Sequence, residues 1–181
     1  MKLLAAMLLL AAAPPVSFAA PDARFRPAAD EYRRIWEGAG ERIVGALEAA
    51  SGLTFPRERI DVTVSRGRPM TSFDGRSMRL RADYSPDYKK ATLVHEMGHR
   101  LAFTLKRPEG RDDGLDDHKL LYLFLYDAWS DLYGPDFADR MAAIERRIGP
   151  GYDSAWSWAL AMTREQRRAR LAALRSGASR P

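Results

Sequence analysis

The stretch HEMGH at residues 95–99 places two histidines four positions apart, with a glutamate directly after the first. Residues four apart lie on one face of an α-helix, so His95 and His99 can direct ring nitrogens at a common metal ion. Glu96 is displaced by about 100° around the helix axis, so it can reach a water molecule beside the ion without binding the ion itself. This pattern indicates a zinc hydrolase in which metal-activated water attacks the substrate and Glu96 is the general base.

Two histidines do not complete a catalytic zinc site, and candidates for the third ligand lie in DDHKLLYLFLYDAWSDLYG at residues 116–134. His118 is the only other histidine in the chain. Asp127 and Asp131 share one helix face inside an apolar segment, where carboxylates are uncommon unless they are bound. His118 lies nine residues before Asp127, so one straight helix would place the two on opposite faces. Both residues therefore remain candidates.

The pair of motifs HEMGH and YDAWSDLYG (residues 126–134) resembles that of the gluzincins, the zinc metallopeptidases of which thermolysin is the familiar member. These proteins carry HExxH on one helix and a segment like NEAxSDxFG on a later helix. The resemblance covers about residues 60–134, and the size of the chain is similar to that of the small minigluzincins. It implies a zincin-like fold and hydrolysis of peptide bonds.

The resemblance also implies roles for single residues. Asp127 matches the third zinc ligand, although the family has a longer glutamate at that position. Asp131 matches the carboxylate that orients a zinc-bound histidine through the far ring nitrogen. His118 remains the alternative third ligand. If His118 is not a ligand, it would instead be a catalytic residue that stabilises the oxyanion of the tetrahedral intermediate.

The surrounding sequence predicts the elements that position these residues. Apolar spacing predicts a helix over 28–50, alternation predicts strands over 60–65 and 77–84 in a small sheet or hairpin, and Ser85-Pro86 begins a helix that continues to about residue 105. A loop over 107–117 and helices over 118–133, 136–148, 153–161 and 164–175 follow, the last with a capping box from Thr163. The expected class is α+β: a mostly helical, zincin-like domain with a small β-sheet preceding the HExxH helix.

The first residues predict export. Lys2 is followed by an apolar run from Leu3 to Ala13, and small residues allow signal-peptidase cleavage between Ala19 and Ala20. We therefore expect residues 1–19 to be a signal peptide outside the fold, residues 20–181 to form a single domain, and the protein to be periplasmic or secreted. An uncleaved anchor is the alternative, but the run is short for a membrane span. After cleavage we expect no stable membrane association.

Composition limits the remaining functions. A chain of 181 residues is typical of one domain, and its net charge of +5 comes from scattered basic residues that do not indicate nucleic-acid binding. Cysteine is absent, so a zinc site must use histidine and carboxylate ligands. The sequence thus predicts an exported zinc (Zn²⁺) metallopeptidase, in the first instance an endopeptidase, acting on a peptide or protein substrate. The alternative is a non-catalytic zinc-binding module that binds a protein partner. The oligomeric state is left open.

Overall fold

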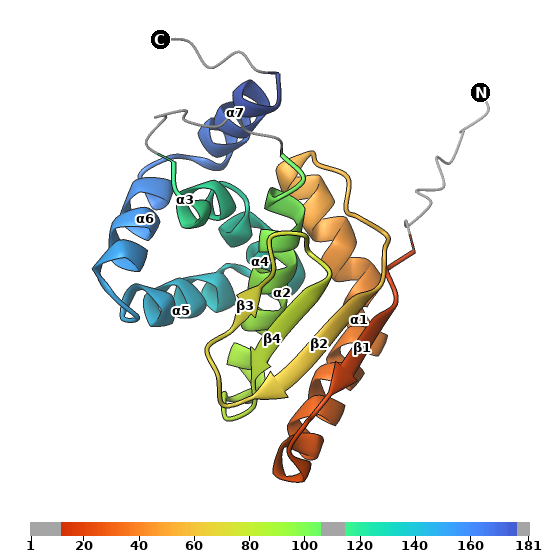
Figure 1. The fold of residues 1–181 in the computed structure, drawn as a ribbon. Coiled ribbons are helices and arrows are strands. Elements are labelled where there is room, and N and C mark those ends of the chain that lie inside the picture. Colours follow the sequence, from red (N-terminus) through yellow and green to blue (C-terminus); the bar gives the residue numbers. More distant parts are fainter. Residues whose placement is uncertain (1–11, 106–114, 177–181) are drawn as a thin grey trace, which may run out of the picture.

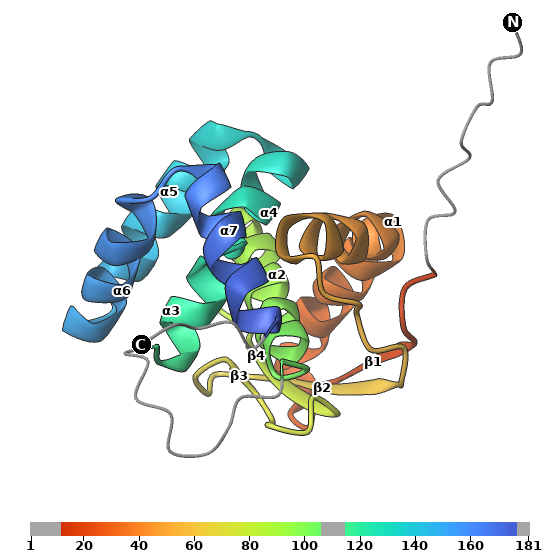
Figure 2. The same cartoon turned by 90° about the horizontal axis from the view of Figure 1, so that it is seen from above.

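The computed structural model describes residues 12–105 and 115–176, and these form a small sheet with helices packed on one face and one end (Figure 1). Viewed from above, helices α1 (Arg26–Ser51) and α2 (Pro86–Ala102) lie across the same face of the sheet (Figure 2). The expected α+β class, mostly helical with a small sheet before the HExxH helix, is confirmed. No helix among the described residues is long and apolar enough to span a bilayer.

The sheet has four strands in the order β1-β2-β4-β3. Their bounds are β1 Val16–Ala19, β2 Ile60–Ser65, β3 Met70–Thr71 and β4 Ser77–Arg81. Strands β2 and β4 pair in parallel, so the two sequence-predicted strands do not form a hairpin with each other. After β2 the chain forms β3 at the edge of the sheet and then turns back into β4. Strands β3 and β4 pair antiparallel. Strand β3 therefore has one edge without a strand neighbour in this sheet.

Strand β1 falls within residues 1–19, the segment expected to be a signal peptide, and whether it is cleaved stays a prediction. It pairs in parallel with β2, and the Phe18 side chain is buried in the core. The Ser17 hydroxyl donates to Asp61 (2.5 Å), and Arg33 donates to the Phe18 carbonyl oxygen (3.0 Å). Alternating apolar residues near a predicted cleavage site fit an edge strand as well as a signal peptide, and the sheet uses them as a strand.

The second half of the chain is helical and surrounds the end of α2 (Figure 1). The helices are α3 Asp117–Tyr122, α4 Leu125–Tyr133, α5 Pro135–Arg146, α6 Pro150–Leu160 and α7 Arg164–Arg175, and a 3-10 turn at Ala23–Phe25 precedes α1. The single helix expected over 118–133 is thus divided in two, at Leu123 and Phe124. The capping box at Thr163 is present. Most of the loop expected over 107–117 lies outside the described residues.

Two contacts fix helix α2 in the interior. A Cβ at Gly98 would lie 2.5 Å from Leu121 Cδ1, so a larger residue there would displace the Leu121 side chain of α3. Arg100, unexpected beside the motif, is buried and donates to the carbonyl oxygens of Gly75 and Glu58, the latter at 2.9 Å. These bonds hold the C-terminal half of α2 against the turn after β3 and the segment before β2.

Candidate metal centre

Three histidines meet where α2 and α3 cross. His95 and His99 come from successive turns of α2, and His118 is the second residue of α3. One ligand nitrogen from each ring lies within 4.8 Å of the other two. His95 and His99 are buried and His118 is partly exposed. Such a cluster could hold a metal ion.

The spacing between the first two imidazoles suits a shared ion. The Nε2 atoms of His95 and His99 lie 3.1 Å apart. Two Zn–N bonds of about 2.0–2.1 Å at a tetrahedral angle would place the nitrogens about 3.3 Å apart. Two buried nitrogen lone pairs this close repel each other unless a proton or a cation lies between them. The 3.1 Å distance between the two Nε2 atoms suits a shared proton or a shared metal ion.

Glu145, at the end of α5, determines the tautomer of His95. One carboxylate oxygen lies 2.7 Å from His95 Nδ1, and the other accepts hydrogen bonds from the Tyr122 hydroxyl (2.9 Å) and the Trp156 indole N–H (3.1 Å). With Nδ1 as the donor to Glu145, the Nε2 lone pair of His95 points at His99. An imidazole held by a carboxylate in this way is the usual support of a metal ligand. Among the described residues, Nδ1 of His99 has no such partner.

Burial and the charge of Glu145 shift the pKa values of the three imidazoles in different directions. Burial lowers the pKa of His99 well below its ordinary value and lowers that of His118, so both imidazoles favour the neutral form that binds a metal. Burial also acts to lower the pKa of His95, but the charge and hydrogen bond of Glu145 outweigh it and leave this pKa raised. The anionic partner therefore makes His95 the most electron-rich of the three rings.

Glu96 lies beside the three histidines without joining them. Its carboxylate is 4% exposed and accepts a hydrogen bond of 2.7 Å from the Thr71 hydroxyl of strand β3. Burial raises its pKa, which brings this carboxylate closer to the range of a general base. Glu96 and His95 line two adjoining cavities, one towards the N-terminus of α2 and one bordered by β3, and Tyr152 of α6 also lines both.

The two aspartates expected at the site are elsewhere. Asp127 is buried against Arg167 of α7, whose guanidinium donates to both carboxylate oxygens at 2.5 and 3.1 Å. Asp131, one turn later, accepts from Arg164, also of α7, at 2.8 Å. The structure thus does not bring Asp127 or Asp131 to the histidines, and His118, the open alternative, occupies the third position. His118 and Asp127 belong to separate helices, α3 and α4, and Asp127 faces Arg167 of α7.

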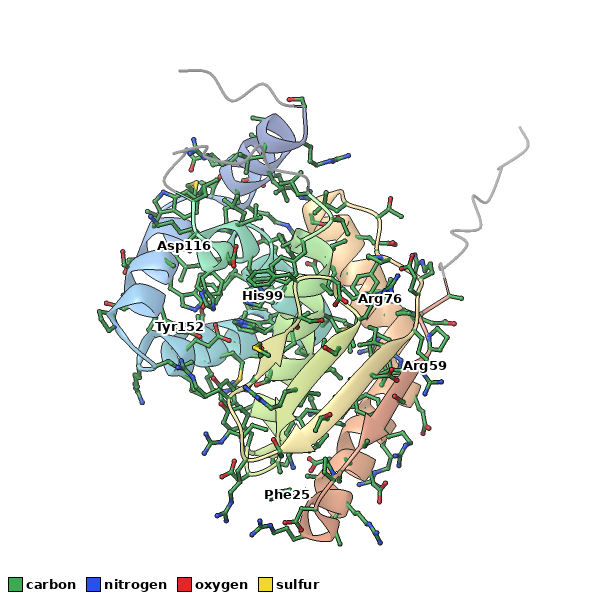
Figure 3. The ribbon with its side chains drawn as sticks, in the orientation of Figure 1. Phe25, Arg59, Arg76, His99, Asp116 and Tyr152 are labelled. Carbon is green, nitrogen blue, oxygen red and sulfur yellow. The ribbon has the colours of Figure 1, made fainter. Side chains whose placement is uncertain are left out.

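Three residues of the site were missed from the sequence. Glu145 stands on the apolar face of α5 with Phe137, Ala138, Met141 and Ala142, and a carboxylate on such a face was a usable signal. Thr71 lies in a strand of two residues, which carries no periodic pattern. Tyr152 packs its ring 4.3 Å from that of His118, and no sequence pattern singles it out. Figure 3 labels Tyr152 on α6 and His99 on α2, at the side of the sheet where the later helices lie.

Comparison with protein-family models, with curated proteins and with solved structures finds no match to this chain. The function therefore depends on the site itself. Three converging imidazoles, one of them oriented by a buried carboxylate, form a candidate metal centre, and a second carboxylate lies at its edge.

Proposed function

We propose that this protein is a zinc-dependent hydrolase that cleaves peptide bonds at the three-histidine centre. The observation that carries the proposal is the placement of Glu96. This residue is buried, its carboxylate accepts a hydrogen bond from Thr71, and it lines the same cavity as the three histidines. A module that only stored or bound a metal would have no use for a buried carboxylate that forms no ion pair with the described residues, since such a group destabilises the fold.

Zinc is the ion that best suits the ligands. His95, His99 and His118 offer three neutral nitrogens from two helices, a donor set typical of catalytic zinc sites that keep a fourth position open. When bound there, zinc would lower the pKa of a water molecule to about 7 and polarise a carbonyl group. Glu145 would strengthen His95 as a ligand through the hydrogen bond to its Nδ1.

The protein's own groups then perform the proton transfers. Glu96 takes the proton of the attacking water and delivers it to the leaving amine, while Thr71 fixes the orientation of its carboxylate. His118, as a ligand, is not free to stabilise the oxyanion. The Tyr152 hydroxyl lines both cavities next to Glu96 and can donate a hydrogen bond to the developing oxyanion instead.

An extended substrate has a place to bind at the sheet edge. Strand β3 borders the cleft, and its outer edge has no strand neighbour. Met70 is 53% exposed and Phe73, in the turn that follows, is 84% exposed, with its ring centroid 5.5 Å from that of Phe103. A peptide that pairs with β3 would pass directly over the histidines with apolar side chains against these three residues.

The direct test is the Glu96→Gln variant, with Glu41→Gln on the exposed face of α1 as the matched control. Both chains should bind one zinc per molecule. We expect Glu96→Gln to lose activity on unfolded casein by at least about 100-fold, the usual contribution of a general base, and the control to retain it. Activity of the Glu96→Gln chain at the control's rate would contradict the mechanism. Zinc binding without any hydrolysis by the wild type would favour the alternative, a zinc-stabilised module for a protein partner.

Export is the second part of the proposal and rests on Lys2 and the apolar run to Ala13. Cleavage between Ala19 and Ala20 would remove strand β1 and uncover β2. The N-terminal sequence of the protein recovered from the periplasm or medium tests this point. A chain that begins at Ala20 supports the predicted cut, whereas a chain that retains Val16 supports an upstream cut or an anchor. Recovery in the cytoplasm alone would contradict export.

A further inference from the structure

The cavity towards the N-terminus of α2 is donor-rich and directly adjoins the metal centre. It has a volume of about 170 Å³, a size suited to one side chain. Its inner end is formed by Thr92, His95, Glu96 and Glu145, and its walls carry three phenols and two guanidinium groups. These polar wall residues are Arg68, Arg81, Tyr84, Tyr88 and Tyr152, and the apolar Pro69 and Ile148 complete the lining.

Most of the carboxylate oxygens of this cavity already accept hydrogen bonds. Both oxygens of Glu145 bind donors from His95, Tyr122 and Trp156, and Glu96 accepts from Thr71. The hydrogen-bonding capacity that remains is therefore mostly that of N–H and O–H donors. A ligand that complements the guanidinium and phenol groups of the walls brings acceptor oxygens and negative charge.

Arg68 is the cation available to a ligand. Arg81 is engaged by Asp83, with its Nε 2.6 Å from the carboxylate, whereas no ion pair joins Arg68 to a carboxylate of the described residues. The positive charge of Arg68 acts to lower the pKa of the Tyr152 phenol, and both residues line the cavity wall. The backbone of Arg68 is fixed, because Arg79 donates to the Arg68 carbonyl oxygen at 2.6 Å.

The tyrosines act as donors in the same cavity. The ring centroids of Tyr84 and Tyr88 lie 4.4 Å apart. Burial raises the pKa of both phenols, and that of Tyr152, so all three keep their protons at neutral pH. A carboxylate in the cavity would meet O–H donors in addition to the Arg68 guanidinium.

We propose that this cavity is the specificity pocket of the enzyme and binds a carboxylate of the peptide substrate, with Arg68 as the residue that decides the preference. The inference rests on the proposed peptidase function, because it places the carboxylate next to the bond that is cut. Peptides supply a carboxylate from two sources, the side chain of Asp or Glu and the C-terminus. The same lining suits either, and the substrates of the test distinguish them.

The test begins with cleavage sites mapped in unfolded casein. One cleaved segment is resynthesised with Glu, Gln or Lys at each position next to the cut, and with a free or an amidated C-terminus just beyond it. We expect kcat/KM to be at least about tenfold higher for Glu than for Gln at one position, or for the free acid than for the amide, as a charge-assisted hydrogen bond implies. If kcat/KM differs by less than twofold between Glu and Gln at every position, and between the free acid and the amide, the proposed carboxylate pocket is wrong.

The Arg68→Glu variant then tests whether Arg68 causes the preference for a carboxylate in the substrate, and Arg76→Glu is the control. Arg76 is exposed in the turn before β4 and lines neither cavity, so the control makes the same change of net charge. We expect Arg68→Glu to remove the preference for the carboxylate and to raise kcat/KM for the Lys peptide, and Arg76→Glu to change neither ratio. An unchanged preference in Arg68→Glu overturns the assignment.

A binding measurement keeps the pocket testable if casein is not cleaved. N-acetylglutamate and N-acetylglutamine are titrated into the zinc-loaded wild type and both variants, followed by NMR of the tyrosine ring signals. Tighter binding of the glutamate compound, at least about tenfold and lost in Arg68→Glu only, supports the pocket even where the peptidase proposal fails. Equal binding of the two compounds by the wild type overturns it.

Discussion

Asp127 and Glu145 are two buried carboxylates on neighbouring helices, exposed by 3% and 2%, that have different roles. Asp127 binds Arg167, a permanent cation, and so joins α4 to α7. Glu145 binds two neutral donors, Tyr122 and Trp156, and the ring of His95. The partner decides the role, because a carboxylate neutralised by a guanidinium has little charge left to offer, whereas Glu145 directs its charge at a metal-ligand candidate.

The largest effect is expected from the two variants that test whether His118 or Asp127 is the third zinc ligand. We expect His118→Ala to abolish stoichiometric zinc binding, because two imidazoles alone do not hold a catalytic zinc. Asp127→Asn should bind one zinc per folded molecule. Zinc content after dialysis, measured by atomic absorption, distinguishes the two. Zinc retained by His118→Ala and lost by folded Asp127→Asn would restore the aspartate as the ligand.

The Asp127→Asn substitution should instead lower the stability of the folded protein. It leaves the Arg167 charge buried without its partner, which we expect to lower the free energy of unfolding by about 3–5 kcal/mol. Urea denaturation of the zinc-free protein measures this change. The control is the double variant Asp127→Leu/Arg167→Met, which removes both charges and should recover most of the loss. A single variant as stable as the wild type would show that the ion pair has no structural role.

Glu145→Gln tests the other half of the comparison. Glutamine cannot accept from His95, Tyr122 and Trp156 at once, since one of its two terminal atoms is a donor. We expect zinc affinity to fall by roughly 10- to 100-fold, as is typical when the group orienting a metal-bound histidine is changed. Competition with a chromogenic chelator gives the affinity. An unchanged zinc affinity would mean that Glu145 serves only the packing of its neighbours.

The smallest effect concerns Asp131, the expected partner of a zinc-bound histidine. It pairs with Arg164 at the surface, where both side chains are about one-third exposed. Asp131→Asn should therefore change the free energy of unfolding by no more than about 1 kcal/mol and leave zinc affinity unaltered. Thermal unfolding and the chelator competition measure both. A loss of zinc affinity comparable to that of Glu145→Gln would reverse the roles of the two carboxylates.

Much of the fold followed from local pattern, and its departures have physical causes. The helix carrying His95 and His99 begins at Pro86 as expected, with Ser85 as its cap. The chain between Leu120 and Trp129 is apolar throughout, and such a run fits one helix or two equally well. The break at Phe124 depends on packing against α2 and could not be read from periodicity. The same limit applies to β1, whose residues also suit a signal peptide.

The sequence by itself determined the two histidines, the general-base candidate and the helix that spaces them, because residues 95, 96 and 99 are related by helix geometry alone. Only the tertiary structure decided the third position and the carboxylate behind it. His118 and Glu145 reach His95 from helices 23 and 50 residues further along the chain, and Leu121 of α3 packs closely over Gly98. Such distances are determined by how helices pack, and no local spacing encodes them.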